Sequence, residues 1–96
     1  MQERTVTITN RLGLHARAAA RLVRRATQYT SAIELIRPDT NQTADGKSIL
    51  SVLLLAATQG TELTIRAAGE DELMAVNGLA DLIDQKFGEE VSDGVF

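Results

Sequence analysis

The sequence predicts an α+β fold, an open-faced sandwich in which three helices cover one face of a four-stranded antiparallel sheet. Two observations lead to this prediction. Segments that alternate apolar and polar residues, as half-buried strands do, are interspersed with segments whose apolar residues recur at helical spacing. The 96 residues are enough for one hydrophobic core but not for two ordinary domains. We therefore expect a single domain over residues 1–96, with elements in the order β-α-β-β-α-β-α.

The first half of the chain contains the first four of these elements. Val6 and Ile8 alternate with threonines, which predicts a strand over residues 4–9. After a break at residues 10–13, a helix of about three turns is expected from Ala16, because its apolar residues are spaced for one face. A strand over residues 32–37, a turn over 38–41 and a short strand over 42–44 complete this half.

The second half contains the other three elements. Residues 47–57 fit either a buried strand or a helix, and their length and the preceding segment favour a helix capped near Ser48. Residues 61–67 alternate as a strand. The acids at 70–72 suit the positive end of a last long helix. We expect that helix to stop near Gly88, with residues 88–96 as a flexible tail, and its apolar face to comprise Met74, Val76, Leu79, Leu82, Ile83 and Phe87.

The composition excludes several classes of function. There is no cysteine and there is one histidine, so we expect no disulfide, no thiolate nucleophile, no metal site and no cofactor. The absence of tryptophan and the net charge of −3 argue against a nucleic-acid partner. No apolar run approaches the ~18 residues of a membrane span. The expectation is therefore a cytoplasmic monomer that does not insert into a membrane.

The charges are distributed unevenly along the chain. Residues 1–25 contain six arginines and one acid, whereas residues 70–96 contain eight acids and one lysine. A positively charged beginning suggests that this end of the protein meets an anionic partner.

His15 is the residue best placed to carry chemistry. It stands between a glycine-containing break and the first predicted helix, at or next to the N-cap. The first turn of a helix presents unpaired N–H groups and a partial positive charge, which favour an anion and keep an imidazole neutral. Arg17 adds a guanidinium that suits phosphate. These features fit a histidine that accepts a phosphoryl group. From spacing alone, a surface histidine that caps a helix is at least as good an interpretation.

Several segments together resemble one protein family. The segment GLHAR at residues 13–17 resembles the active-site motif of the HPr family, the histidine phosphocarriers of the bacterial phosphotransferase system. The segment GKSIL at residues 46–50 resembles the family's regulatory serine segment. Residues 59–63 and 68–72 match its later strand and the start of its last helix. The likeness runs from about Arg4 to Phe87, with the motifs in the family's order and spacing.

The resemblance implies a function as well as a fold. His15 would accept a phosphoryl group from phosphorylated enzyme I, which phosphoenolpyruvate charges, and would pass it to a IIA-type protein or domain. Arg17 and the backbone N–H groups of Ala16 and Arg17 would hold the group, and the family uses ring nitrogen Nδ1. Such a protein is a stoichiometric carrier and not an independent enzyme. One departure is Ala18, where the family usually has proline; alanine preserves the helix and adds one free N–H.

Ser48 has two compatible interpretations. A serine before a helix is an ordinary N-cap. The resemblance adds that HPr kinase/phosphorylase would phosphorylate Ser48, placing about two negative charges next to the surface that partners use. An alternative function follows, a mainly regulatory HPr-like binding protein in carbon or nitrogen control. Ser48 phosphorylation would switch it, and it would have little role in sugar transport.

The expected docking surface combines apolar and basic residues. Residues 49–55 contain more apolar side chains than one buried face can hide. The resemblance assigns Ile49, Leu50 and Leu53 to an exposed patch beside the histidine, and leaves Val52, Leu54 and Leu55 to the core. Arg24, with Arg21 or Arg25, would form a basic rim that steers acidic partners, and Lys47 is a further docking candidate. A rival function, a small-molecule sensor, needs a pocket, which the short loops do not suggest.

Overall fold

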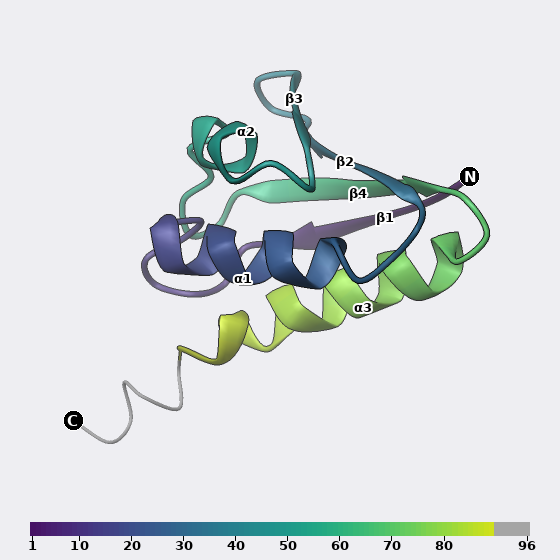
Figure 1. Ribbon diagram of the computed structural model, residues 1–96. Helices are drawn as coiled ribbons and strands as arrows, with labels where there is room; N and C mark the ends of the chain where they lie inside the picture. Colours follow the sequence, from purple (N-terminus) through teal and green to yellow (C-terminus); the bar gives the residue numbers. More distant parts are fainter. Residues whose placement is uncertain (90–96) are drawn as a thin grey trace.

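The computed structural model describes residues 1–89, and residues 90–96 of the predicted tail lie outside the described part. The elements follow the predicted order β-α-β-β-α-β-α, with a short 3-10 turn, η1, at the end (Figure 1). Their bounds are β1 (Gln2–Thr7), α1 (Ala16–Ala26), β2 (Ala32–Arg37), β3 (Gln42–Asp45), α2 (Ile49–Leu54), β4 (Glu62–Ala68), α3 (Glu72–Asp84) and η1 (Lys86–Gly88).

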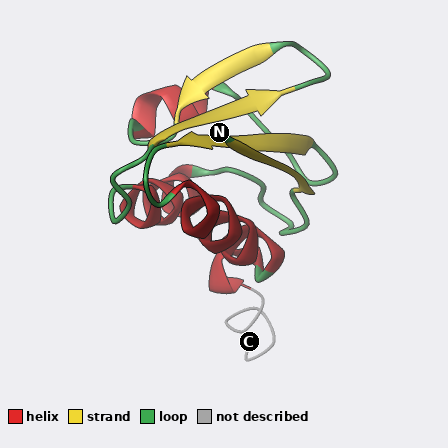
Figure 2. Cartoon of the chain, turned by 90° about the vertical axis from the view of Figure 1, so that its right-hand side faces the viewer, coloured by secondary structure: helices red, strands yellow, loops and turns green. Residues whose placement is uncertain are grey.

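The four strands form one open sheet in the order β1-β4-β2-β3. Every neighbouring pair is antiparallel, and β4 is central because it pairs with both β1 and β2. Figure 2 shows the sheet above a layer of helices. α3 packs against β1 and β4, whereas α2 packs against α1 and the β3 edge. The predicted fold class, a four-stranded antiparallel open sheet with three helices, is therefore confirmed.

The core is built from aliphatic side chains on the inner face of the sheet and on the helices. In β4, Leu63, Ile65 and Ala67 are buried and alternate with more accessible residues. α1 buries one stripe, and its small residues let it approach the sheet closely; the stripe comprises Ala18, Ala19, Leu22, Val23 and Ala26. This packing fixes the orientation of α1 and thereby the position of the residue that precedes it, His15.

Two helices differ from prediction in the residues they expose. In α2, Leu54 is 66 % exposed, whereas Leu53 is half-buried against the core, the reverse of what was expected. Val52 and Leu55 lie three residues apart and take the inner side of α2, so Leu54 faces solvent. In α3, Met74 is 68 % exposed because the buried stripe runs through the residues Ala75, Val76, Leu79, Ala80 and Ile83.

Asp71, the residue before α3, ties the start of that helix to the segment between α1 and β2. Its carboxylate accepts hydrogen bonds from the backbone N–H groups of Thr30 (2.8 Å) and Ser31 (2.9 Å), and from the Ser31 hydroxyl. The Ser31 hydroxyl, followed by the Thr30 amide, stabilises the ionised form and lowers the pKa of Asp71 to about 2. The ionised carboxylate therefore contributes to stability.

We expect the variant Asp71→Asn to have a lower free energy of unfolding at pH 7. Because the folded pKa lies below the unfolded value of 3.8, the native advantage is complete above that value and is lost as pH falls towards 2. Urea unfolding of both proteins between pH 7 and pH 2 should show the two stabilities converging in acid. A difference that stays constant over this range would contradict the assigned role of the charge.

Candidate functional site

The candidate site lies at the beginning of α1. His15 is the N-cap residue with extended backbone (φ −74°, ψ 178°), and its carbonyl accepts the first intrahelical bond from the Ala19 N–H at 2.8 Å. The N–H groups of Ala16, Arg17 and Ala18 therefore have no intrahelical acceptor, as is general in a first turn. They form the positive end of the helix dipole next to the ring. α1 begins at Ala16 as predicted, so alanine at position 18 leaves the helix intact.

The loop before His15 requires glycine at one position. Gly13 has φ +66°, and a Cβ there would lie 2.6 Å from the carbonyl oxygen of Ala57 and 2.9 Å from Cα of Thr58. This close approach lets the Leu14 N–H donate to the same Ala57 carbonyl at 2.9 Å. The position of the histidine is thus set by the chain that follows α2.

The His15 ring is held by residues that the sequence did not single out. Its side chain is 28 % exposed, and Nε2 contacts the carboxylate of Glu89, whose side chain is 12 % exposed. The Nδ2 group of Asn10 donates to the other Glu89 oxygen and to the Gly13 carbonyl, both at 2.8 Å. Asn10 reads in the sequence as a turn residue and Glu89 as part of the tail, so both roles were missed. Nothing in the sequence around Glu89 distinguishes it from the adjacent Glu90.

Arg17 lies in the same first turn as His15. Its side chain is exposed, and within residues 1–89 it makes no hydrogen bond or ion pair. The guanidinium is consequently available to an anion bound at the beginning of the helix.

Only part of the predicted basic docking surface is exposed in the structure. Arg24 is exposed on α1, as expected of a docking residue. Arg21 is half-buried, and its guanidinium donates to the carbonyl of Phe87. The Lys47 ammonium donates to the carbonyl of Tyr29 at 2.8 Å, and Tyr29 follows the end of α1, far from His15. Of the three, only Arg24 is exposed in the way that a rim residue needs.

Four large apolar side chains in the loop before His15 and on α2 are exposed, and we refer to Leu12, Ile49, Leu50 and Leu54 as the apolar patch. Their exposed fractions are 63 %, 46 %, 67 % and 66 %, respectively. Leu12 was not predicted, and Leu54 takes the place expected of Leu53. Exposed apolar side chains grouped on one short helix are typical of an interaction surface.

Ser48 is the N-cap of α2, as predicted. It is half-buried, and its Oγ accepts a hydrogen bond from the Ser51 N–H at 3.3 Å. Lys47 places this end of α2 near the end of α1, whereas Ala57, after α2, contacts the loop before His15. Ser48 therefore lies at the end of α2 that is away from the loop before His15.

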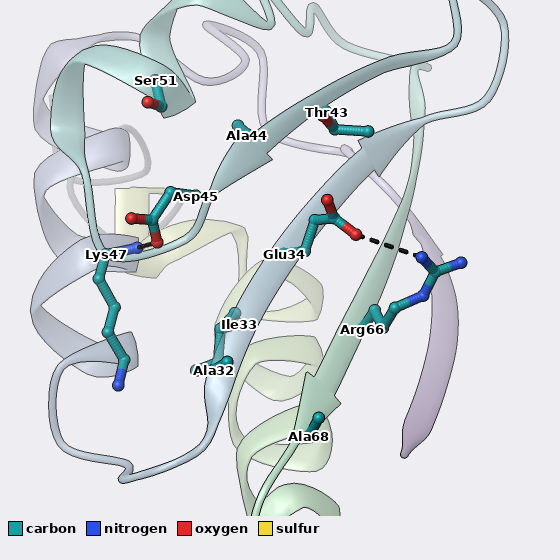
Figure 3. A pocket seen from close by; sticks show the side chains of 10 residues that line it. All are labelled: Ala32, Ile33, Glu34, Thr43, Ala44, Asp45, Lys47, Ser51, Arg66 and Ala68. Atoms are coloured by element: carbon teal, nitrogen blue, oxygen red, sulfur yellow. Dashed lines mark hydrogen bonds and ion pairs between the residues drawn. The ribbon is translucent and has the colours of Figure 1, made fainter.

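A separate open groove lies on the sheet face turned away from α1 and α3 (Figure 3). Its lining comes mainly from β2, β3 and β4 and includes Lys47 and Ser51, but neither His15 nor Arg17. Arg66 donates to Glu34 there at 3.2 Å, so the two charges compensate one another. Strands and not loops form this groove, and the histidine does not line it.

Residues 1–89 contain neither a metal-binding cluster nor a membrane-spanning helix. No group of three or more metal-ligating side chains is arranged to hold an ion in that part of the chain. No helix there combines the length and the apolar character needed to cross a bilayer.

Comparison with known proteins identifies the family. Residues 2–85 match the family model described as "PTS HPr component phosphorylation site". The chain is 42 % identical over 90 residues to the phosphocarrier protein HPr of Xylella fastidiosa (strain Temecula1), covering 94 % of this chain and 99 % of that protein. It is 45 % identical over 84 residues to that of Pseudomonas aeruginosa, covering 88 % and 92 %.

A solved structure extends this likeness to three dimensions. The crystal structure of HPr-C-His from Thermoanaerobacter tengcongensis superposes with a TM-score of 0.87 at 40 % identity, covering 92 % of this chain and 97 % of that one. Sequence and fold agree with those of these phosphocarriers, and the chain belongs to the HPr family of phosphocarrier proteins of the phosphotransferase system.

Proposed function

We propose that this protein accepts a phosphoryl group on His15 from phosphorylated enzyme I and passes it to a IIA-type protein or domain. The observation that carries the proposal is the placement of His15 as N-cap of α1, with the exposed Arg17 in the first turn after it. The phosphocarrier names of the relatives support the same function.

The geometry suits a reversible transfer. A ring nitrogen of His15 supplies its electron pair to phosphorus, and the bond from phosphorus to its donor atom on enzyme I breaks, returning its pair to that atom. The N–H groups of Ala16 and Arg17 and the Arg17 guanidinium stabilise the negative oxygens. Each such contact at a surface contributes roughly 0.3–1 kcal/mol, so the phosphoryl group is stabilised weakly enough to be transferred onward.

Phosphorylation by enzyme I and phosphoenolpyruvate tests this proposal. The purified protein should gain one phosphoryl group that is acid-labile and alkali-stable, that maps to the peptide containing His15, and that disappears when a IIA acceptor is added. No phosphate, or phosphate on another residue, would overturn the proposal. Binding controlled by Ser48 would then become the leading function, in carbon or nitrogen control.

We further propose that HPr kinase/phosphorylase modifies Ser48 and that this weakens docking of enzyme I. Since Ser48 lies at the far end of α2 from His15, the added charge acts through the docking surface and leaves the ring untouched. The N-terminal position in α2 tolerates the phosphate, and like charges then repel an acidic partner surface.

The variant Ser48→Asp should show a lower second-order rate constant for phosphorylation by enzyme I, and the loss should shrink as salt is added. Ser48→Ala is the matched control because it removes the hydroxyl without adding charge; it should cost about 1 kcal/mol of stability and leave the rate constant close to native. Equal rate constants for the aspartate and alanine variants at low salt would contradict the electrostatic effect.

A further inference from the structure

The chain after α3 continues to the side of the molecule on which α1 begins (Figure 1), and η1 contacts α1. Lys86, Phe87 and Gly88 have φ values of 57°, 56° and 77°, so three consecutive residues are in the left-handed region and the helical path is kinked there. The Phe87 side chain is 2 % exposed within the core, and Arg21 on α1 donates to its carbonyl. An uncommon backbone conformation is thus anchored on both sides. It directs the next residue, Glu89, to the histidine.

The contacts of Glu89 determine which nitrogen of His15 carries the proton. Asn10 is fully buried and faces two acceptors, the Gly13 carbonyl and Glu89, so its amide nitrogen must be the atom that points to them. The second Glu89 oxygen contacts Nε2 of His15. An ionised carboxylate only accepts hydrogen bonds, so Nε2 must carry hydrogen. In the neutral ring, Nδ1 is then the nitrogen with the free electron pair.

We propose that Glu89 is a positioning residue that fixes His15 in the Nε2–H tautomer and compensates the charge that the ring acquires on phosphorylation. The proposal rests on the function proposed above. When the electron pair of Nδ1 forms the bond to phosphorus, the donor's bond to phosphorus breaks, and the ring becomes a cation that keeps its Nε2 proton. The negative Glu89 carboxylate stabilises that cation. Onward transfer returns the electron pair to Nδ1 and leaves the ring neutral, so no proton has to move.

Three variants test this role. Glu89→Ala removes the acceptor. Glu89→Gln is more informative. Asn10 still donates a hydrogen bond, so the glutamine side chain turns its oxygen to Asn10 and its NH₂ group to Nε2 of His15. That arrangement favours the tautomer with hydrogen on Nδ1, which blocks the nucleophile. Glu70→Gln is the matched control, an exposed glutamate between β4 and α3 at the opposite end of the sheet.

The readouts are the tautomer, by ¹H–¹⁵N NMR of the imidazole nitrogens, and the rate of phosphorylation by enzyme I. In the native protein and in Glu70→Gln, we expect the His15 ring to be entirely in the Nε2–H tautomer. Glu89→Ala should become a mixture of tautomers with a rate about tenfold lower, as for the loss of one charge-assisted hydrogen bond. Glu89→Gln should shift towards Nδ1–H with at least the same loss. Circular dichroism confirms that each variant is folded.

The outcomes separate this inference from the proposed function. If native protein takes up phosphate and both Glu89 variants keep the native tautomer, the positioning role is overturned, whether or not the rate falls. A shifted tautomer with an unchanged rate would overturn the catalytic consequence. If native protein takes up no phosphate, the proposed function fails, while the tautomer still tests the contact between Glu89 and His15.

Discussion

With His15 replaced by alanine, the protein takes up no acid-labile phosphate from enzyme I and phosphoenolpyruvate. His15 is the single histidine of a chain without cysteine, so no comparable nucleophile can substitute for it. The variant keeps Arg17 and the backbone N–H groups, but they only stabilise a group that another atom must bind. The expected loss is complete, below detection by mass spectrometry.

The variant should remain folded, which makes the loss interpretable. The His15 side chain makes no capping hydrogen bond to α1, and the helix is held by its buried stripe instead. Arg17→Ala is the companion variant: it should slow phosphorylation without abolishing it, because the nucleophile is intact. Acid-labile phosphate that persists in His15→Ala would refute the assignment. Acid-stable phosphate on Ser48 would have a different origin.

Phe87→Ala should lower the free energy of unfolding by about 3–5 kcal/mol, the usual cost of truncating a buried phenylalanine. Phe87 is among the largest fully enclosed side chains of the protein and is 2 % exposed. It also holds the turn that brings Glu89 to His15, so a packing change here reaches the site. We therefore expect the phosphorylation rate to fall along with the stability.

Urea unfolding measures the change in the free energy of unfolding, and Leu73→Ala provides the control. Leu73 is 57 % exposed on α3, so its truncation should change stability by no more than about 0.5 kcal/mol. Where the alanine variant is too unstable for kinetics, Phe87→Leu removes less volume and keeps the protein folded. A stability loss for Phe87→Ala as small as that for Leu73→Ala would show that the anchor is unimportant.

The fold was predictable because its local signals are consistent. The alternation in β4 and the apolar stripe of α1 each match the period of the structure they form, and Ser48 caps α2 as its position indicates. The errors have equally local causes. α2 spans only six residues, too few for periodicity to decide whether Leu53 or Leu54 faces solvent.

Only the part of the candidate site that comes from one short stretch of sequence was predictable. His15 and Arg17 are close in sequence, so one helix beginning brings them together. Asn10 and Glu89 are separated by nearly the whole chain and meet through a turn of left-handed residues that includes the non-glycine Phe87. Neither hydropathy nor turn composition signals such a turn, because tertiary packing imposes it.

The position of β4 at the centre of the sheet has a consequence for how the protein folds. β1 can pair only with β4, so Val6 must find Leu63 across most of the chain. Closing so long a loop is entropically costly, whereas β2 and β3 are joined by a short turn and can pair early. The pairing of β1 with β4 is therefore expected to limit the folding rate. Substitutions at this seam should slow folding more than substitutions in the β2–β3 hairpin.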